Sequence, residues 1–204
     1  MDFEEANPAA IGNGNSASVL FPNWQVLVGG TPTSVVGYNT ETLGAPFVSM
    51  WDDKLGYVPI QGDYTAFLQS ARLGSQSATV GLSQTGLVPE GTESIQLDAN
   101  QEEGSSFVVM LGGNVVPMSP VQSFSGYTLY EGNASEWAGQ SVALTITELP
   151  PDNQEFSPNL LQLDNISFSP NPITITPEPD ALTLMSVGGL LFGIYRRIQR
   201  IRKC

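Results

Sequence analysis

The chain has no histidine, and its 204 residues include a single cysteine, Cys204. The absence of histidine excludes Ser-His-Asp and Cys-His nucleophilic systems in their usual form, and every metal site with an imidazole ligand. One cysteine cannot form an intramolecular disulfide, so the hydrophobic core alone must stabilise the fold. Because Cys204 is the last residue, thiolate catalysis by the body of the protein is excluded as well.

Basic residues are scarce in the first 195 residues, where only Lys54 and Arg72 carry positive charge. All 20 acidic residues lie in the same part of the chain, so its formal charge is 2 − 20 = −18, whereas the last nine residues carry +5. Binding to a nucleic-acid backbone requires Lys and Arg, so we expect no nucleic-acid partner. An acidic surface also keeps a protein soluble without any specific ligand.

No segment before residue 181 sustains a helical period, and we predict an all-β body. Gly (21 residues) and Pro (15 residues) punctuate short apolar or alternating runs, as in a β-sandwich. Two sheets packed face to face would bury every second residue of such runs. The predicted strands are Ser18–Phe21, Trp24–Val28, Val35–Tyr38, Tyr64–Gln69, Ala78–Gln84, Glu93–Asp98, Ser106–Leu111, Thr128–Glu131, Ser141–Glu148 and Gln162–Ser169.

Five phrases carry a more particular resemblance. They are Phe3-Glu4, Phe21–Val26, Ser83–Pro89 followed by Ser94–Leu97, Trp137–Leu144 and Leu163–Phe168. In this order they resemble the galactose-binding-like jelly roll, a fold shared by many carbohydrate-binding modules. The resemblance implies a jelly-roll β-sandwich.

The same resemblance implies a structural calcium ion shared by an N-terminal acidic residue and an acidic residue of the last strand. The matching positions are Glu4 and Asp164. Calcium takes six to eight oxygen ligands, including carboxylates and backbone carbonyls. The alternative is that both residues are ordinary surface carboxylates of an acid-rich protein.

Sugar sites use aromatic faces flanked by side chains that hydrogen-bond hydroxyl groups. The segment Trp51–Tyr57 is predicted to be a polar–aromatic loop. Its residues Trp51, Asp52, Asp53 and Tyr57 are therefore our candidates for binding polysaccharide. Burial of Trp51 in the core is the competing interpretation, because large aromatic side chains are mostly buried.

Catalysis would require a pair of carboxylates, as in a glycosidase. Asp52-Asp53, Asp63, Glu102-Glu103 and Glu136 could supply one, but no catalytic motif accompanies these common residues. Phosphate-loop and dinucleotide fingerprints are also missing. We therefore expect a protein that is not an enzyme. It either binds polysaccharide or serves as a structural envelope protein without a specific ligand.

The C-terminal segment has three parts: Pro177-Glu178-Pro179, an apolar run over residues 181–195 and a basic end. The fifteen-residue run corresponds to about 22 Å of helix, which is short for a hydrocarbon core of about 30 Å. Positive charge beyond an apolar segment tends to stay cytoplasmic, so we expect the C-terminus inside and the body outside. The basic residues are Arg196, Arg197, Arg200, Arg202 and Lys203.

This order of parts resembles the PEP-CTERM sorting signal, which is also catalogued as an ice-binding-protein C-terminal domain. The resemblance implies a bacterial protein that is anchored transiently in the inner membrane, processed by an exosortase and delivered to the cell surface or an extracellular polysaccharide matrix. The alternative is an ordinary single-span anchor. The chain begins Met1-Asp2-Phe3-Glu4-Glu5, so an N-terminal signal peptide is expected to be missing from this sequence.

The expected domain organisation follows from these assignments. A jelly-roll domain is predicted over residues 1–169, an extended Pro-rich linker over 170–176 and the sorting signal over 177–204. The Pro residues of the linker disfavour helix, and an extended linker would leave the Pro-Glu-Pro accessible to a membrane enzyme.

Overall fold

The computed structural model describes residues 1–11, 17–73, 76–152 and 158–173. The chain divides into two units, Met1–Ile173 and Thr174–Cys204. The predicted apolar helix and sorting signal belong to the second unit and lie outside the described residues. Within the ranges described, no helix is both long enough and apolar enough to cross a membrane.

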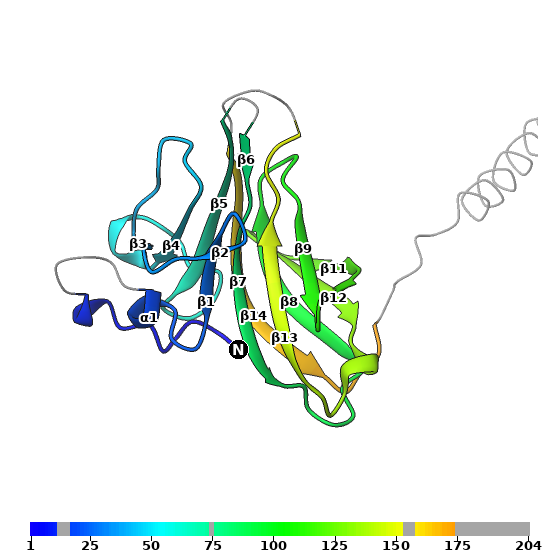
Figure 1. Cartoon of the computed structure of the whole chain (residues 1–204). Coiled ribbons are helices and arrows are strands. Elements are labelled where there is room, and N and C mark those ends of the chain that lie inside the picture. Colours follow the sequence, from blue (N-terminus) through cyan, green and yellow to red (C-terminus); the bar gives the residue numbers. More distant parts are fainter. Residues whose placement is uncertain (12–16, 74–75, 153–157, 174–204) are drawn as a thin grey trace, which may run out of the picture. The chain divides into compact units, whose positions relative to one another are not determined.

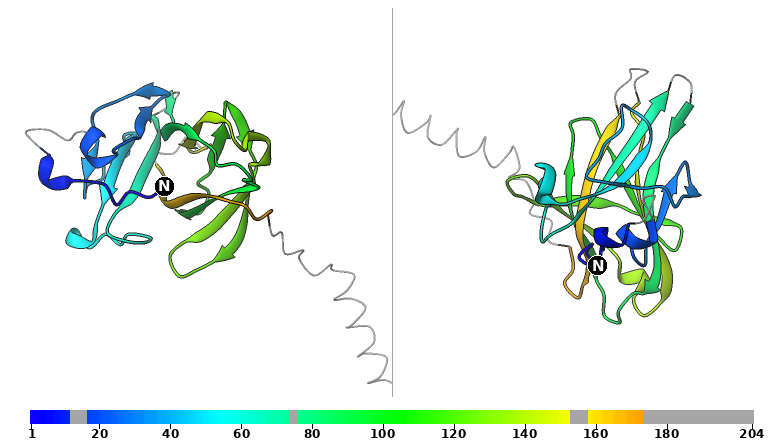
Figure 2. Two further views of the ribbon diagram at one scale, coloured as in Figure 1. Left: turned by 90° about the horizontal axis from the view of Figure 1, so that it is seen from below. Right: turned by 90° about the vertical axis from the view of Figure 1, so that its left-hand side faces the viewer.

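Two β-sheets pack face to face to form the first unit (Figure 1, Figure 2). The six-stranded sheet has the order β10-β9-β13-β7-β1-β2. Its strands are β1 (Gln25–Val28), β2 (Thr31–Pro32), β7 (Val80–Leu87), β9 (Phe107–Leu111), β10 (Asn114–Val116) and β13 (Ser141–Glu148).

The eight-stranded sheet has the order β11-β12-β8-β14-β5-β4-β3, with β6 paired to β5. Its strands are β3 (Gly37–Tyr38), β4 (Phe47–Trp51), β5 (Thr65–Leu73), β6 (Gln76–Ala78), β8 (Ser94–Gln101), β11 (Met118–Ser123), β12 (Thr128–Asn133) and β14 (Asn159–Ser169). Neighbouring strands run antiparallel except for the parallel pair β3 and β4. The predicted fold class of the body, an all-β jelly-roll sandwich, is confirmed.

Short helical segments precede the first strand or lie between later strands. They are η1 (Pro8–Ala10), α1 (Ala17–Leu20), η2 (Asp53–Leu55) and η3 (Ser135–Trp137). The strand predicted at Ser18–Phe21 is wrong, because this segment forms α1 and the Phe21 amide donates to the Ala17 carbonyl at 2.7 Å. Ala17 and Leu20 are both buried, and a short apolar run does not distinguish a strand from one helical turn.

The other predicted strands overlap observed ones, and Ser141–Glu148 has the observed bounds of β13. Strand β4 was not predicted. Trp51 is its last residue, so the prediction that Trp51 begins a loop is wrong. The run Phe47–Trp51 lies between Pro46 and Asp52 and is short and mostly apolar, which is typical of a buried strand.

Alternate residues of both sheets fill the core between them. In the eight-stranded sheet these include Leu68, Leu97 and Leu161, each with 0% of its surface exposed. The N-terminal segment closes one side of the core, where the ring of Phe3 packs on Trp24 with a centroid distance of 5.8 Å. Trp24 belongs to the core cluster.

Candidate functional site

The outer face of the eight-stranded sheet differs in character from its core face. Because side chains alternate along a strand, residues next to core residues point away from the core. Gln162 lies between the core residues Leu161 and Leu163, and Asn100 follows the core residue Ala99. Gln162 and Asn100 are directly paired across β14 and β8. This face therefore carries two neighbouring side-chain amides.

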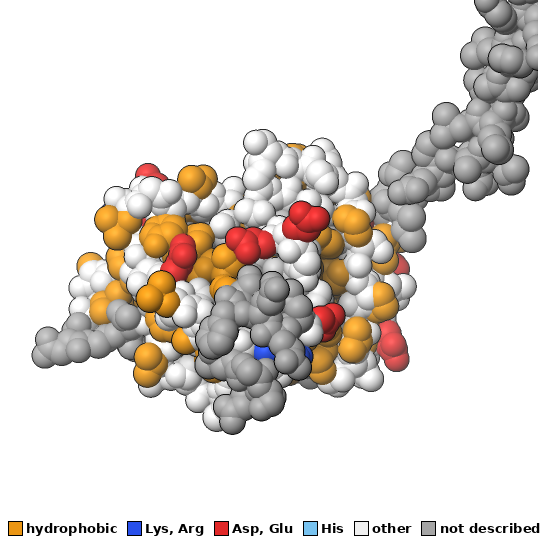
Figure 3. All heavy atoms as spheres, turned by 90° about the horizontal axis from the view of Figure 1, so that it is seen from above, with side chains coloured by type: hydrophobic (Ala, Val, Ile, Leu, Met, Phe, Trp, Pro, Cys, Tyr) orange, Lys and Arg blue, Asp and Glu red, His pale blue; other side chains and the backbone are white. Residues whose placement is uncertain are grey.

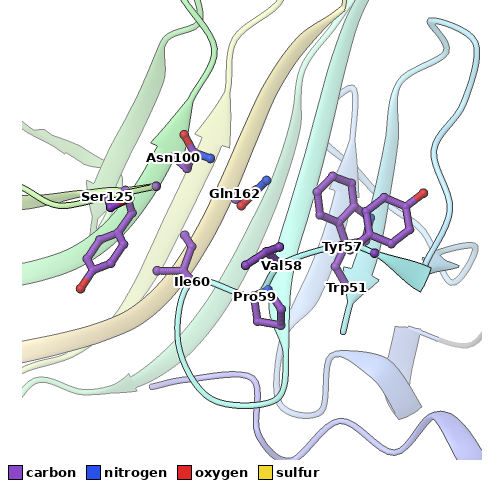
Figure 4. Close-up of a pocket in the computed structure, with 11 residues that line it drawn as sticks. Trp51, Tyr57, Val58, Pro59, Ile60, Asn100, Ser125 and Gln162 are labelled. Carbon is purple, nitrogen blue, oxygen red and sulfur yellow. The ribbon is translucent and has the colours of Figure 1, made fainter. Parts of the chain in front are cut away.

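A hollow of about 300 Å³ lies over these amides (Figure 4). One wall is the segment Gly56–Ile60, which follows β4, and the opposite wall is the tip Ser125–Tyr127 between β11 and β12. Figure 4 shows Asn100 and Gln162 between Ser125 on one side and Trp51 with Tyr57 on the other.

A second hollow of about 300 Å³ continues from the first. Both are lined by Trp51, Asn100 and Gln162, so they form one groove. The second part is also lined by Phe67 and Glu41 and by the residues Glu102, Leu160 and Leu161. We refer to the two parts together as the outer groove.

Trp51 is held between two other rings of the outer groove. Its ring stacks on Tyr57 at a centroid distance of 4.3 Å and on Phe67 at 3.9 Å. This stacking explains why Trp51 is only 6% exposed although it lies on the outer face. Its indole Nε1 is buried and has no hydrogen-bond partner among the described residues. Trp51 therefore supports the aromatic wall, and Tyr57 presents that wall to the groove.

The opposite wall has its own aromatic pair. Phe124 and Tyr127 stack at 4.7 Å with an interplanar angle of 18°, and the Phe124 amide donates to the Tyr127 carbonyl at 2.8 Å. Phe124 is 42% exposed, and Tyr127 lines the groove. Aromatic side chains thus stand on both sides of the two amides.

The wall segment that contains Ile60 is anchored by two buried carboxylates of the same sheet. The Gln61 side chain donates to Asp98 at 2.8 Å, and its backbone amide donates to Asp164 at 3.2 Å. Asp98 and Asp164 face each other across β8 and β14. Asn165 contacts both carboxylates, through its side chain to Asp98 and its backbone amide to Asp164. This network fixes one end of the wall.

Two of the predicted ligand residues, Asp52 and Asp53, do not line the groove. Asp52 is 3% exposed and accepts hydrogen bonds from Tyr38, Asn39 and Lys54. Burial disfavours its charged form, but hydrogen bonds from Lys54, Tyr38 and Asn39 outweigh this effect and hold the pKa of Asp52 well below its usual range. Asp52 also caps η2, and Asp53 is exposed.

The two predicted calcium ligands converge on one loop. The carboxylate of Glu4 accepts hydrogen bonds from the Asp63 and Tyr64 backbone amides at 3.0 and 3.2 Å. Asp164 accepts one from the Thr65 hydroxyl at 3.0 Å. A Cβ on residue 62 would lie 2.2 Å from Glu4 Oε1, so this close approach requires Gly62. Residues 160 positions apart are thus brought to one short loop.

These two carboxylates fit a hard cation in kind, because both offer oxygen ligands. Burial is the main cause that raises the pKa of Asp164 to about 6, and the nearby charge of Glu4 raises it further. Among the described residues, no group of three or more Asp, Glu, Cys or His side chains could hold a metal. Backbone carbonyls and water would have to supply the other ligands, so the calcium site stays a prediction.

The remaining carboxylates proposed for catalysis are spread over the molecule. Asp63 belongs to the loop held by Glu4, and Glu136 lies in η3. Glu102 and Glu103 are exposed in the connection between β8 and β9. Their sequence context predicts a hairpin loop, which is wrong, because β8 and β9 belong to different sheets. Of these residues, only Glu102 lines the outer groove.

Asn100, Gln162 and Tyr127 line the groove, although they were not among the binding residues predicted from the sequence. The strict alternation of β8 and β14 places Asn100 and Gln162 on the outer face, but it does not reveal which strands become neighbours. The sequence offered a second signal for the groove. Two aromatic residues, Phe124 and Tyr127, flank the turn residues Ser125-Gly126.

No protein-family model matches the chain. The curated proteins contain no match either. Among solved structures, the chain is similar to TmCBM61 in complex with β-1,4-galactotriose, with 14% identity over 73% of this chain and 89% of that one, and a TM-score of 0.47.

A second similar structure is the enzymatically active domain of bacteriophage CBA120 tailspike protein 4. It is 15% identical over 78% of this chain and 21% of that one, with a TM-score of 0.42. The family 11 carbohydrate-binding module from Clostridium thermocellum, in complex with a β-1,3-1,4-mixed-linked tetrasaccharide, is 10% identical over 72% and 88%, with a TM-score of 0.38. At such values these structures identify neither a ligand nor an activity for this chain.

Proposed function

We propose that the outer groove binds polysaccharide and that the protein is a non-catalytic surface or matrix component. The observation that carries the proposal is the adjacent pair of side-chain amides, Asn100 and Gln162. Neither amide makes a side-chain hydrogen bond within the described part of the chain, and both lie on the floor between two aromatic walls.

This arrangement suits both the polar hydroxyl groups and the apolar C–H faces of a sugar. An amide offers both donors and an acceptor, so two neighbouring amides can bind adjacent hydroxyl groups. The rings of Tyr57 and Tyr127 can contact the apolar C–H faces. Each hollow has a volume near the lower end of the roughly 300–1,000 Å³ of ligand sites. The two hollows together form a groove that a short stretch of a polymer would occupy.

The C-terminal segment supports the location in this proposal. Pro177-Glu178-Pro179, the apolar run over 181–195 and the basic end are the parts expected of a sorting signal. We propose export, a transient inner-membrane anchor with a cytoplasmic C-terminus, cleavage by an exosortase-type enzyme, and release to the cell surface or matrix. The support for this part is the sequence pattern.

Binding in the groove is tested with a glycan array probed with the full chain. Calorimetry then measures the affinity for the neutral polymer that binds most strongly on the array. The variant N100A/Q162A should bind at least tenfold more weakly, because each lost hydrogen bond contributes on the order of 1 kcal/mol. Tyr57→Ala should also bind more weakly. Gln25→Ala, an exposed glutamine on β1 of the other sheet, is the matched control and should bind as the wild type does.

Three outcomes contradict the proposal in different ways. If no glycan binds at millimolar concentrations, an envelope component without a specific ligand is the better interpretation. If N100A/Q162A binds as well as the wild type, another surface binds the glycan. Hydrolysis of a polymer would instead favour a glycan-processing enzyme.

The sorting part is tested by deleting residues 196–203 in a bacterium that contains an exosortase. For a precursor that reaches the inner membrane, loss of the basic end should impair retention there and reduce the cleaved form. The cleaved and uncleaved forms are separated by size in membrane and medium fractions. Unchanged cleavage and release would contradict this part of the proposal.

A further inference from the structure

We infer that Glu41 and Glu102 make the outer groove selective for uncharged glycan segments over anionic ones such as polyuronates. This inference rests on the proposed binding of polysaccharide in the groove. Both residues line its second hollow, and both are exposed. Glu102 follows β8, and the loop with Glu41 precedes β4. Strands β14 and β5 lie between β8 and β4 in the sheet, so the two acids come from strands on opposite sides of this pair.

Glu41 is placed by a buried anchor. The loop between β3 and β4 is fastened to the outer face by Gln69, which is 1% exposed. The Gln69 side-chain nitrogen donates to Thr42 Oγ1 at 2.6 Å and to the Ala45 carbonyl at 2.8 Å. The Thr42 hydroxyl in turn donates to the Ala45 carbonyl at 2.6 Å. These hydrogen bonds fasten Thr42, the residue next to Glu41, to the sheet.

Glu102 is placed by the sheet itself. It directly follows β8, and its backbone amide donates to the Leu160 carbonyl of β14 at 3.3 Å. Its own carbonyl accepts the Ser105 amide at 3.0 Å, which closes the turn behind it. Since Leu160 also lines the second hollow, this bond ties Glu102 to the floor of the groove.

Among the residues that the structure describes, no positive charge offsets these two carboxylates in the groove. The described residues include two cationic side chains, Lys54 and Arg72, and neither lines either hollow. The Lys54 ammonium is paired with Asp52 at 2.6 Å and also donates to Tyr38. On the face drawn in Figure 3, acidic side chains are scattered widely and basic ones show only beside the grey atoms. The groove therefore offers an anion no counter-charge.

The physical consequence is repulsion that salt can remove. A glycan carboxylate in the second hollow would meet like charges. At short range near a protein surface, this repulsion is strong enough to weaken binding about tenfold or more. The Debye length falls from about 30 Å at 0.01 M salt to about 3 Å at 1 M, so the penalty should shrink across this range. A neutral segment should bind with little dependence on salt.

The test uses the full chain and two matched probes. The first is the neutral, hexose-based polymer that binds best on the array, and the second is the same polymer with its C6 hydroxyls oxidised to carboxylates. In 10 mM salt, oxidation should weaken binding to the wild type at least tenfold and binding to E41Q/E102Q less than threefold. In 1 M salt, the loss of affinity caused by oxidation should differ by less than twofold between the wild type and E41Q/E102Q.

The control variant E90Q/E136Q changes two exposed acids that do not line the groove. It alters the net charge by the same amount as E41Q/E102Q, so it should retain the wild-type discrimination. Equal relief in both variants would assign the effect to overall charge and overturn the inference. Equal losses in the wild type and E41Q/E102Q would overturn it too, since the C6 hydroxyl itself would then be needed.

Failure of this inference is distinguishable from failure of the proposed function. If the wild type binds no neutral polymer, both fall together. If it binds the neutral polymer and its oxidised form equally in 10 mM salt, only the inference falls. Cleavage of the polymer that is lost in E41Q or E102Q would show that these acids are catalytic, and it would also overturn the inference.

Discussion

The two faces of the eight-stranded sheet are built from the same strands but follow different rules. On the core face, residues such as Leu161 and Leu163 are fully buried in an apolar cluster. On the outer face, the residue between them is Gln162, whose amide lines a groove. A change of one position along β14 therefore moves from the packed core to the lining of the groove.

This comparison shows where polar groups are tolerated and why. Outer-face carboxylates that are buried, such as Asp98 and Asp164, accept hydrogen bonds from the loop that they anchor. A buried carboxylate also lies on the core face of the other sheet. Glu148 continues the inward row of Leu144 and Ile146 on β13, and it is 0% exposed. Both of its carboxylate oxygens lack a partner among the described residues.

The largest expected effect on stability comes from Glu148. It tests most directly whether a buried carboxylate without a hydrogen-bond partner is tolerated on a core face. Burial raises its pKa to about 8 from an ordinary 4.5. A carboxyl group whose pKa is raised on folding favours the folded state below pH 4.5, and this contribution is lost as the pH rises towards 8. At about 1.36 kcal/mol per unit, the loss is on the order of 4 kcal/mol.

Denaturant unfolding of the wild type and of Glu148→Gln at pH 5 and pH 8 measures this loss. The difference between the two proteins should be small at pH 5, and the variant should be more stable at pH 8. Taking the difference removes the contributions of Asp98 and Asp164, whose pKa values are also raised by burial. If the difference does not change with pH, Glu148 is not buried without a partner.

The neighbours Leu161 and Gln162 test the comparison within one strand. Leu161→Ala removes a fully buried side chain and should lower the free energy of unfolding by about 3 kcal/mol, within the 2–5 kcal/mol typical of this change. Gln162→Ala should change it by less than about 0.5 kcal/mol. Glycan affinity should fall in Gln162→Ala and stay close to that of the wild type in Leu161→Ala, provided that Leu161→Ala is measured well below its melting temperature. Similar stability losses in both variants would mean that Gln162 contributes to packing.

The same alternation sets how far the sequence could predict the structure. The alternating pattern over Ser141–Glu148 is local, and it predicted β13 with its observed bounds. The prediction of a strand at Ser18–Phe21 was wrong because one turn of helix and a short strand bury the same apolar residues. Strand β4 was missed because its residues are buried on both faces, so Phe47–Trp51 shows little alternation.

The groove could be predicted only in part. Trp51 and Tyr57 were found because they are aromatic residues close together in the sequence. Asn100 and Gln162 were not, because the pairing of β8 with β14 joins positions 62 residues apart. Asp52 was misjudged for a similar reason. Its partners Tyr38 and Asn39 come from β3 and the residue after it, and the parallel pairing of β3 with β4 brings them to its carboxylate.

Calcium binding at Glu4 and Asp164 has the smallest expected effect and would sharpen the role of outer-face carboxylates. A ligand that binds only the folded state at 100 times its Kd stabilises by about 2.7 kcal/mol. Millimolar calcium should therefore raise the melting temperature relative to chelator, and Glu4→Gln and Asp164→Asn should reduce this shift. Glu5→Gln is the control, because Glu5 accepts a hydrogen bond from Asn23 outside this loop. If calcium and chelator give the same melting temperature, Glu4 and Asp164 stabilise the loop at Gln61–Thr65 through their hydrogen bonds alone. That result would make the outer-face carboxylates anchors for the groove wall and nothing more.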